Sequence, residues 1–146
     1  MTAAAALKPG DILAGDFVRS ARAAFRAAAT PVASHATKGF DLFAAGEYAA
    51  AAAELSQAMR LDQTSAPVAF VLGWAYEGTG DHRQAIGSWR GAAAIDPKMV
   101  PAHLALADAY LRLSEKALAA QAVRAGLAAL PDSPELKAKL EQIEGK

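Results

Sequence analysis

The chain has 146 residues, a length typical of one domain, and its 15 lysines and arginines balance 15 aspartates and glutamates. A chain without net charge lacks the basic surface that neutralises phosphates, so we expect no nucleic-acid partner. Hydrophobic residues make up 53% of the chain and alanine dominates among them, which favours closely packed helices over β-strands, while the absence of cysteine excludes disulfides, thiolate catalysis and cysteine-bound metals.

Residues 1–31 form an N-terminal segment with an amphipathic helix. Residues 8–10, Lys-Pro-Gly, predict a turn, and Asp16 is placed to cap a helix over 16–29. One face of this helix carries Phe17, Ala21, Ala24 and Phe25, and the opposite face carries Arg19, Arg22 and Arg26. Three interpretations stay open: a helix that covers the neighbouring part of the chain, a remnant of a preceding repeat or linker in a longer protein, and a helix on a membrane surface.

The centre of the chain repeats at a constant step over three frames of equal length, 32–65, 66–99 and 100–133. The residues that recur at this step are Gly46 and Gly80, Leu72 and Leu106, Tyr76 and Tyr110, Pro97 and Pro131, and Ala51, Ala85 and Ala119. Gly80 supplies a turn without a Cβ, and Asp81 caps the helix that follows. The helices expected in the three frames cover 32–45, 47–62, 66–79, 82–95, 99–113 and 116–130.

Residues 134–146 are expected to form a C-terminal capping helix over 134–144. Asp132 and Ser133 precede Pro134, which is favoured at the first position of a helix. Leu136, Leu140 and Ile143 then form one apolar stripe. We expect this stripe to cover the last repeat, because a helical repeat array needs a polar outer surface at its end. A docking helix for a partner is the alternative.

The middle frame shows the repeat pattern most fully. Its pattern residues are Ala69, Leu72, Gly73, Tyr76, Ala85, Trp89 and Pro97. This pattern resembles the tetratricopeptide repeat (TPR), and the resemblance covers residues 32–133, about two thirds of the chain. It implies an all-α, right-handed solenoid of three antiparallel helix pairs, in which Gly73 faces Ala85. The first frame departs from the pattern with Lys38 and Gln63 at the leucine and proline positions, and the third places Ser114 at the turn glycine.

No group of residues predicts catalysis, a metal site or a cofactor. The histidines at 35, 82 and 103 lack the spacing of metal ligands, and no serine lies in a nucleophile elbow. No segment approaches the roughly 20 apolar residues of a membrane span, and the first residues do not resemble a signal peptide. We therefore expect a cytoplasmic protein that is not an enzyme.

The resemblance also implies a concave groove lined by the first helix of each repeat. The residues expected to form this peptide-binding groove are Phe40, Phe43, Phe70, Trp74, Glu77, Leu104, Asp108, Leu111 and Arg112. Ala36 and Phe40 stand where chaperone-binding members have lysine and asparagine, so no clamp for a peptide carboxylate is expected. The predicted function is a non-catalytic scaffold or adaptor that binds an apolar or helical segment of a partner protein. A self-associating domain or a structural spacer of a larger protein is the alternative.

Overall fold

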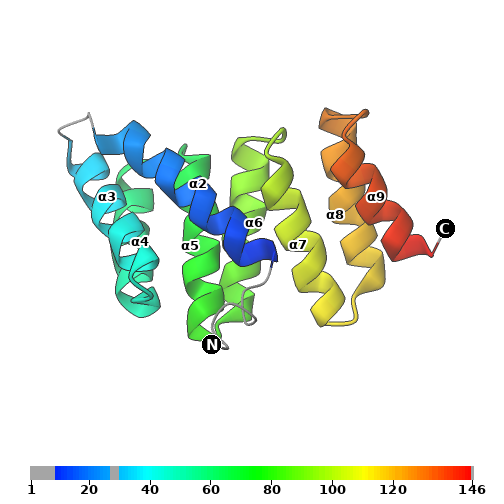
Figure 1. Ribbon diagram of the computed structural model, residues 1–146, viewed down its shortest axis with the longest axis horizontal. Helices are drawn as coiled ribbons and strands as arrows, with labels where there is room; N and C mark the ends of the chain where they lie inside the picture. The colour runs from blue at the N-terminus through cyan, green and yellow to red at the C-terminus, as the bar shows by residue number, and fades with distance from the viewer. Residues whose placement is uncertain (1–8, 27–29, 146) are drawn as a thin grey trace.

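The computed structural model of the chain describes residues 9–26 and 30–145, and these residues form eight α-helices. From α3 to α9 the helices stand side by side in alternating directions, and α2 crosses in front of α5 (Figure 1). The helices are α2 (Pro9–Arg26), α3 (Pro31–Ala44), α4 (Tyr48–Leu61), α5 (Ala66–Thr79), α6 (His82–Ile95), α7 (Val100–Arg112), α8 (Lys116–Ala129) and α9 (Pro134–Glu144). The fold is all-α, built from sequential antiparallel pairs α3–α4, α5–α6 and α7–α8, with α9 packed on α8 and α7.

Capping residues fix where the helices begin. The Oγ1 atom of Thr30 accepts a hydrogen bond from the Ala33 amide at 3.1 Å, and Ser133 Oγ accepts one from Leu136 at 3.3 Å. The carboxylate of Asp81 accepts from the Gln84 amide at 3.3 Å, which confirms the predicted cap of α6. Each of these side chains satisfies one of the amides that the first helical turn leaves without a partner.

The link from the first pair to the second turns without the proline of the repeat pattern. The carboxylate of Asp62 accepts from the amide of Thr64 at 2.9 Å and from its hydroxyl at 2.5 Å, and these bonds hold the pKa of Asp62 below its ordinary value. Asp96, at the equivalent position of the next repeat, accepts from the Lys98 amide at 3.1 Å. An aspartate therefore shapes both links, and Gln63 fits at the proline position.

The N-terminal helix differs from its predicted bounds. It begins at Pro9, not near Asp16, because proline costs nothing in the first turn of a helix, where its missing N–H has no partner. Asp16 lies inside α2 and pairs with Arg19 at 2.5 Å, one turn later, instead of capping the helix. Residues 27–29, which the prediction included in this helix, lie outside the described part of the chain.

The close approach within the second pair involves Gly73 and Trp89. A Cβ at residue 73 would overlap the indole of Trp89, whose Nε1 donates to the Phe70 carbonyl at 3.1 Å. The predicted neighbour of Gly73, Ala85, is itself fully buried. The glycine therefore makes room for a tryptophan ring, and the buried indole keeps a hydrogen-bond partner.

The buried residues form two clusters. The larger draws mainly on α2 to α7 and includes Phe40, Phe70 and Trp89. The smaller joins α7, α8 and α9 around Val123 and Leu136. In the described part of the chain no helix is long and apolar enough to cross a membrane.

Candidate interaction surface

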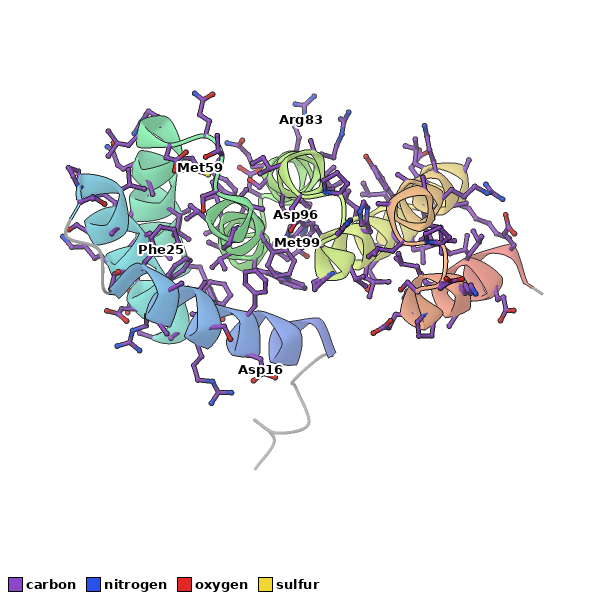
Figure 2. The ribbon with its side chains drawn as sticks, turned by 90° about the horizontal axis from the view of Figure 1, so that it is seen from above. Asp16, Phe25, Met59, Arg83, Asp96 and Met99 are labelled. Carbon is purple, nitrogen blue, oxygen red and sulfur yellow. The ribbon has the colours of Figure 1, made fainter. Side chains whose placement is uncertain are left out.

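The first helices of the pairs share one face of the molecule, which we term the first-helix face. Figure 2 shows α3, α5 and α7 toward this face, together with α9, while α4, α6 and α8 lie toward the opposite one. All nine residues of the predicted groove belong to α3, α5 or α7. The N-terminal helix α2 lies on the same face, where it packs against α3 and α5. The face is therefore partly occupied by a helix of the same chain.

Two groove residues are covered by α2. Phe40 is 0% exposed and Phe70 is 1% exposed. The ring of Phe25 lies 5.9 Å from that of Phe40, and the ring of Phe17 lies 4.9 Å from that of Phe70. In this conformation neither Phe40 nor Phe70 can touch a partner, so their binding role stays a prediction that requires α2 to leave.

Phe43 and Trp74 are half-buried and make edge-to-face contacts. The ring of Phe43 lies 5.3 Å from that of Tyr48, and the ring of Trp74 lies 5.0 Å from that of Trp89. Trp74 thus covers the interior of the second pair and also contributes to the surface. A pocket of about 280 Å³ lies beside Phe43, lined by Gly15, Val18, Arg19, Arg22, Phe43, Ala44 and Tyr48.

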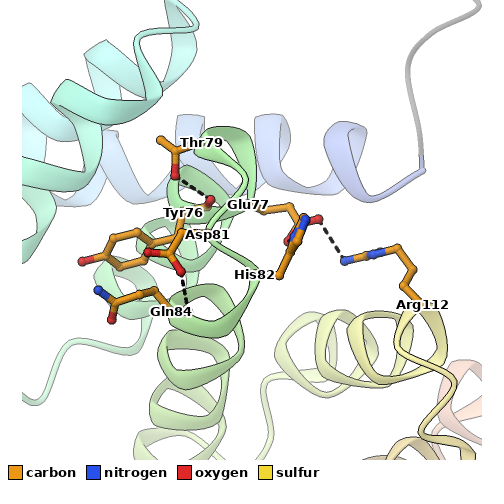
Figure 3. A network of polar contacts seen from close by, with 7 residues as sticks. All are labelled: Tyr76, Glu77, Thr79, Asp81, His82, Gln84 and Arg112. Atoms are coloured by element: carbon orange, nitrogen blue, oxygen red, sulfur yellow. Dashed lines mark hydrogen bonds and ion pairs between the residues drawn. The ribbon is translucent and has the colours of Figure 1, made fainter.

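The charged groove residues join neighbouring elements. Arg112 donates to Glu77 Oε2 at 3.1 Å, which links α7 to α5, and His82 lies 2.9 Å from the other carboxylate oxygen, Glu77 Oε1 (Figure 3). Lys139 of α9 donates to Asp108 at 2.8 Å. Each of the three charged groove residues therefore has a partner of opposite charge: Arg112 pairs with Glu77, and Asp108 pairs with Lys139.

Leu104 and Leu111 are half-buried on α7. Both pack against the cluster that α7, α8 and α9 share. With Arg112, they form the part of the first-helix face that continues beyond the residues under α2. The structure therefore divides the predicted groove into a part that α2 covers, at Phe40 and Phe70, and a part that solvent reaches, on α7 and at Trp74 and Glu77 of α5.

A second pocket was missed by the sequence analysis. It has a volume of about 430 Å³ and lies where α6, α7 and α8 meet, with Arg90, Leu106, Tyr110, Leu118, Gln121, Ala122 and Ala125 around it. Leu118 is among the exposed large apolar residues. The pocket could not be predicted from the repeat pattern, because that pattern specifies which residues touch and not how completely a junction is filled.

The histidines take structural positions. His35 lies 2.8 Å from Glu54, and buried His103 donates from Nε2 to the Pro97 carbonyl at 2.7 Å. Within residues 9–26 and 30–145, no group of three or more acidic, histidine or cysteine residues could hold a metal ion. The surface therefore offers apolar contact and ion pairing, which are the means by which proteins bind other proteins.

Comparisons with known proteins agree with this architecture. Residues 78–143 match the sequence family described as tetratricopeptide repeat. No curated protein matches the sequence. The fold resembles the TPR domain of Sgt2 from Aspergillus fumigatus, with 24% identity, a TM-score of 0.62, and 74% of this chain and 73% of that one covered.

Two further solved structures share the fold. The second TPR domain of human RPAP3, solved with an Hsp70 peptide, has 20% identity and a TM-score of 0.67, over 80% of this chain and 97% of that one. The Yersinia enterocolitica type III secretion chaperone SycD, solved with a peptide of the translocator YopD, has 22% identity and a TM-score of 0.64, over 74% of this chain and 88% of that one. Each of these two neighbours was therefore solved with a bound peptide.

Proposed function

Because the chain is a tetratricopeptide repeat protein, we propose that it is a non-catalytic interaction module that binds an apolar or helical segment of a partner protein on the first-helix face. One observation carries this proposal: the face already accommodates an amphipathic helix, α2, with Phe17 and Phe25 against Phe70 and Phe40. A surface that packs one such helix has the shape and apolar character to pack another.

The open part of the face supplies the contacts that a partner needs. Leu104 and Leu111 offer apolar surface, and Trp74 adds an aromatic side chain of the kind enriched at binding hot spots. Glu77, Asp108 and Arg112 place charges of both signs beside these residues and orient the bound segment. Charged groups at the edge of an apolar surface contribute mainly to specificity and association rate.

The ligand that suits this face is not an acidic C-terminal tail. Ala36 and Phe40 occupy the positions where chaperone-binding members carry lysine and asparagine, and both side chains are fully buried here. They can offer no hydrogen bond to a terminal carboxylate. The proposed ligand is therefore an internal apolar or helical segment, unlike the Hsp70 peptide in the RPAP3 structure.

The test compares two leucine substitutions that lie two residues apart. Leu111→Glu places a charge on the first-helix face, whereas Leu113→Glu changes a leucine that is already 53% exposed at the end of α7. We expect partners captured from a lysate of the source organism by the unmodified chain to be retained by Leu113→Glu and lost by Leu111→Glu. Circular dichroism verifies that both variants are folded. Equal capture by both variants would contradict the proposal.

The alternative, a self-associating or spacer domain, is tested with the same proteins. Sedimentation velocity over a range of concentrations measures the mass of the unmodified chain. If the mass rises with concentration and Leu111→Glu abolishes this rise, the first-helix face joins two copies of the chain. A constant monomer mass favours a partner of a different sequence.

A further inference from the structure

The two terminal helices pack in different ways. Helix α9 lies against α8 and α7, so it continues the stack of helices. Helix α2 lies against α3 and α5, which are the first helices of two consecutive pairs. A helix that only covered the end of the array would contact one pair, whereas α2 crosses the first-helix face (Figure 1). Its position is that of a bound ligand.

The contacts of α2 follow one side of the helix. Phe17 and Phe25 are separated by slightly more than two helical turns, and each reaches one aromatic residue of the face, Phe70 or Phe40. Halfway between them, Ala21 is 7% exposed and lets the helices approach closely. Figure 2 shows Phe25 on the side of α2 toward the other helices and Asp16 on the outer side.

A partly exposed ion pair joins α2 to α3. The Nε atom of Arg22 lies 2.7 Å from Asp41 Oδ1. The neighbouring Arg19 pairs only within α2, with Asp16. Arg22 therefore adds a modest charge contact that favours this register of the docked helix, whereas the ion pair of Arg19 lies within α2.

The docking of α2 is incomplete. The pocket of about 280 Å³ lies between Val18 and Arg22 of α2 and Phe43 and Tyr48 beside them. Of the described α2 side chains, Val18 and Ala21 are buried, whereas α5 buries eight residues. Elements with few buried apolar contacts open at low free-energy cost, while close-packed elements do not.

We infer that α2 is an internal ligand of the first-helix face, and that a partner helix with the same side-chain pattern displaces it. The pattern is an aromatic residue at positions i and i+8, a small residue at i+4 and a basic residue at i+5, as in Phe17, Ala21, Arg22 and Phe25. This inference rests on the proposed function and names its ligand class. Only molecules in which α2 has left the face can bind the partner. The apparent affinity is therefore the intrinsic affinity multiplied by the fraction of molecules in which α2 is undocked.

The test uses a fluorescently labelled synthetic peptide with the sequence of residues 9–26, titrated with the full chain. In the release variant, Phe17→Ser and Phe25→Ser weaken the resident helix. In the matched control, Ala23→Ser and Ala24→Ser place two serines at exposed positions of α2; the sequence pattern assigns Ala24 to the apolar face, but the structure leaves it exposed. We expect the peptide to bind the release variant at least about 10-fold more tightly than the unmodified chain or the control. A peptide with both phenylalanines replaced by serine is expected not to bind.

A covalent lock provides the opposite test. The chain has no cysteine, so Arg22→Cys with Asp41→Cys can be joined by a bismaleimide linker. The same double variant is compared with and without the linker, and the linked form is expected to bind the peptide at least about 10-fold more weakly than the unlinked form. Retention of binding after locking would overturn the inference, even if the release variant does not fold.

The outcomes separate this inference from the proposed function. Equal peptide affinity for the release variant and the unmodified chain, or no binding to a folded release variant, would overturn the inference. The proposed function would still stand on its own test, which uses Leu111 and natural partners. Conversely, tighter peptide binding to the release variant would support the inference even if the lysate experiment captured no natural partner.

Discussion

At the scale of single residues, Ser114 departs from its two counterparts. Gly46, Gly80 and Ser114 occupy the same position in the three repeats and have φ angles of 82°, 85° and 60°. At each site the same backbone bond closes the turn, as when the Glu115 amide donates to the Tyr110 carbonyl at 2.8 Å. All three residues adopt the left-handed backbone conformation, but of the three only Ser114 has a Cβ atom, which crowds the backbone in this conformation.

We predict that Ser114→Gly stabilises the protein by about 0.5–1 kcal/mol. The relief of the left-handed strain, roughly 1–2 kcal/mol, exceeds the added entropy of glycine in the unfolded chain. Urea unfolding followed by circular dichroism measures the change. The control is Ser88→Gly inside α6, where the substitution should destabilise by about 0.5 kcal/mol. A stability of Ser114→Gly equal to or below that of the unmodified chain would contradict the explanation.

At the scale of elements, local signals predicted most helix starts and the pairing of helices within each repeat. Ser133 with Pro134, and Gly80 with Asp81, each act within a few residues, so their effect can be read from neighbouring positions. The predicted start of α2 at residue 16 was wrong. Pro9 suits either a turn or the first turn of a helix, and the sequence pattern does not decide between them.

The position of α2 on the first-helix face could not be predicted for a different reason. The amphipathic pattern of Phe17 and Phe25 indicates that the helix needs an apolar surface, but it is compatible with a covering helix, a remnant of a preceding repeat or linker, and a helix on a membrane surface. The choice depends on contacts with Phe40 and Phe70, which belong to two other helices and are distant in sequence. Packing between α5 and α6 likewise places the indole of Trp89 nearest to Gly73.

The C-terminal helix α9 buries Leu136, which is 0% exposed and lies beside Gly126 of α8. We predict that Leu136→Ala destabilises the protein by about 2–4 kcal/mol, because it removes buried apolar contacts and leaves a cavity. Leu113→Ala is the matched control, since the same substitution at an exposed leucine should cost below about 1 kcal/mol. Thermal and urea unfolding measure both variants, and equal costs would show that α9 does not stabilise the array.

At the scale of the whole molecule, the helices form an array in which each pair contacts its neighbours. The stability of such an array is approximately a sum over pairs and their interfaces. The larger buried cluster is centred on α5, which buries eight residues, and the smaller cluster holds α8 and α9. The pocket of about 430 Å³ at the junction of α6, α7 and α8 lies between these two regions.

We therefore predict that the molecule opens from its ends. In native-state hydrogen exchange, amides of α9 and α2 should exchange at least about 10-fold faster than those of α5 and α6, with α8 between them. Leu136→Ala should accelerate exchange in α8 and α9 and leave α5 nearly unchanged, because its effect stays within the smaller cluster. The release variant should accelerate exchange in α2 and α3. Uniform exchange in all helices would instead show a single cooperative unit, in which α2 could not leave the first-helix face without global unfolding.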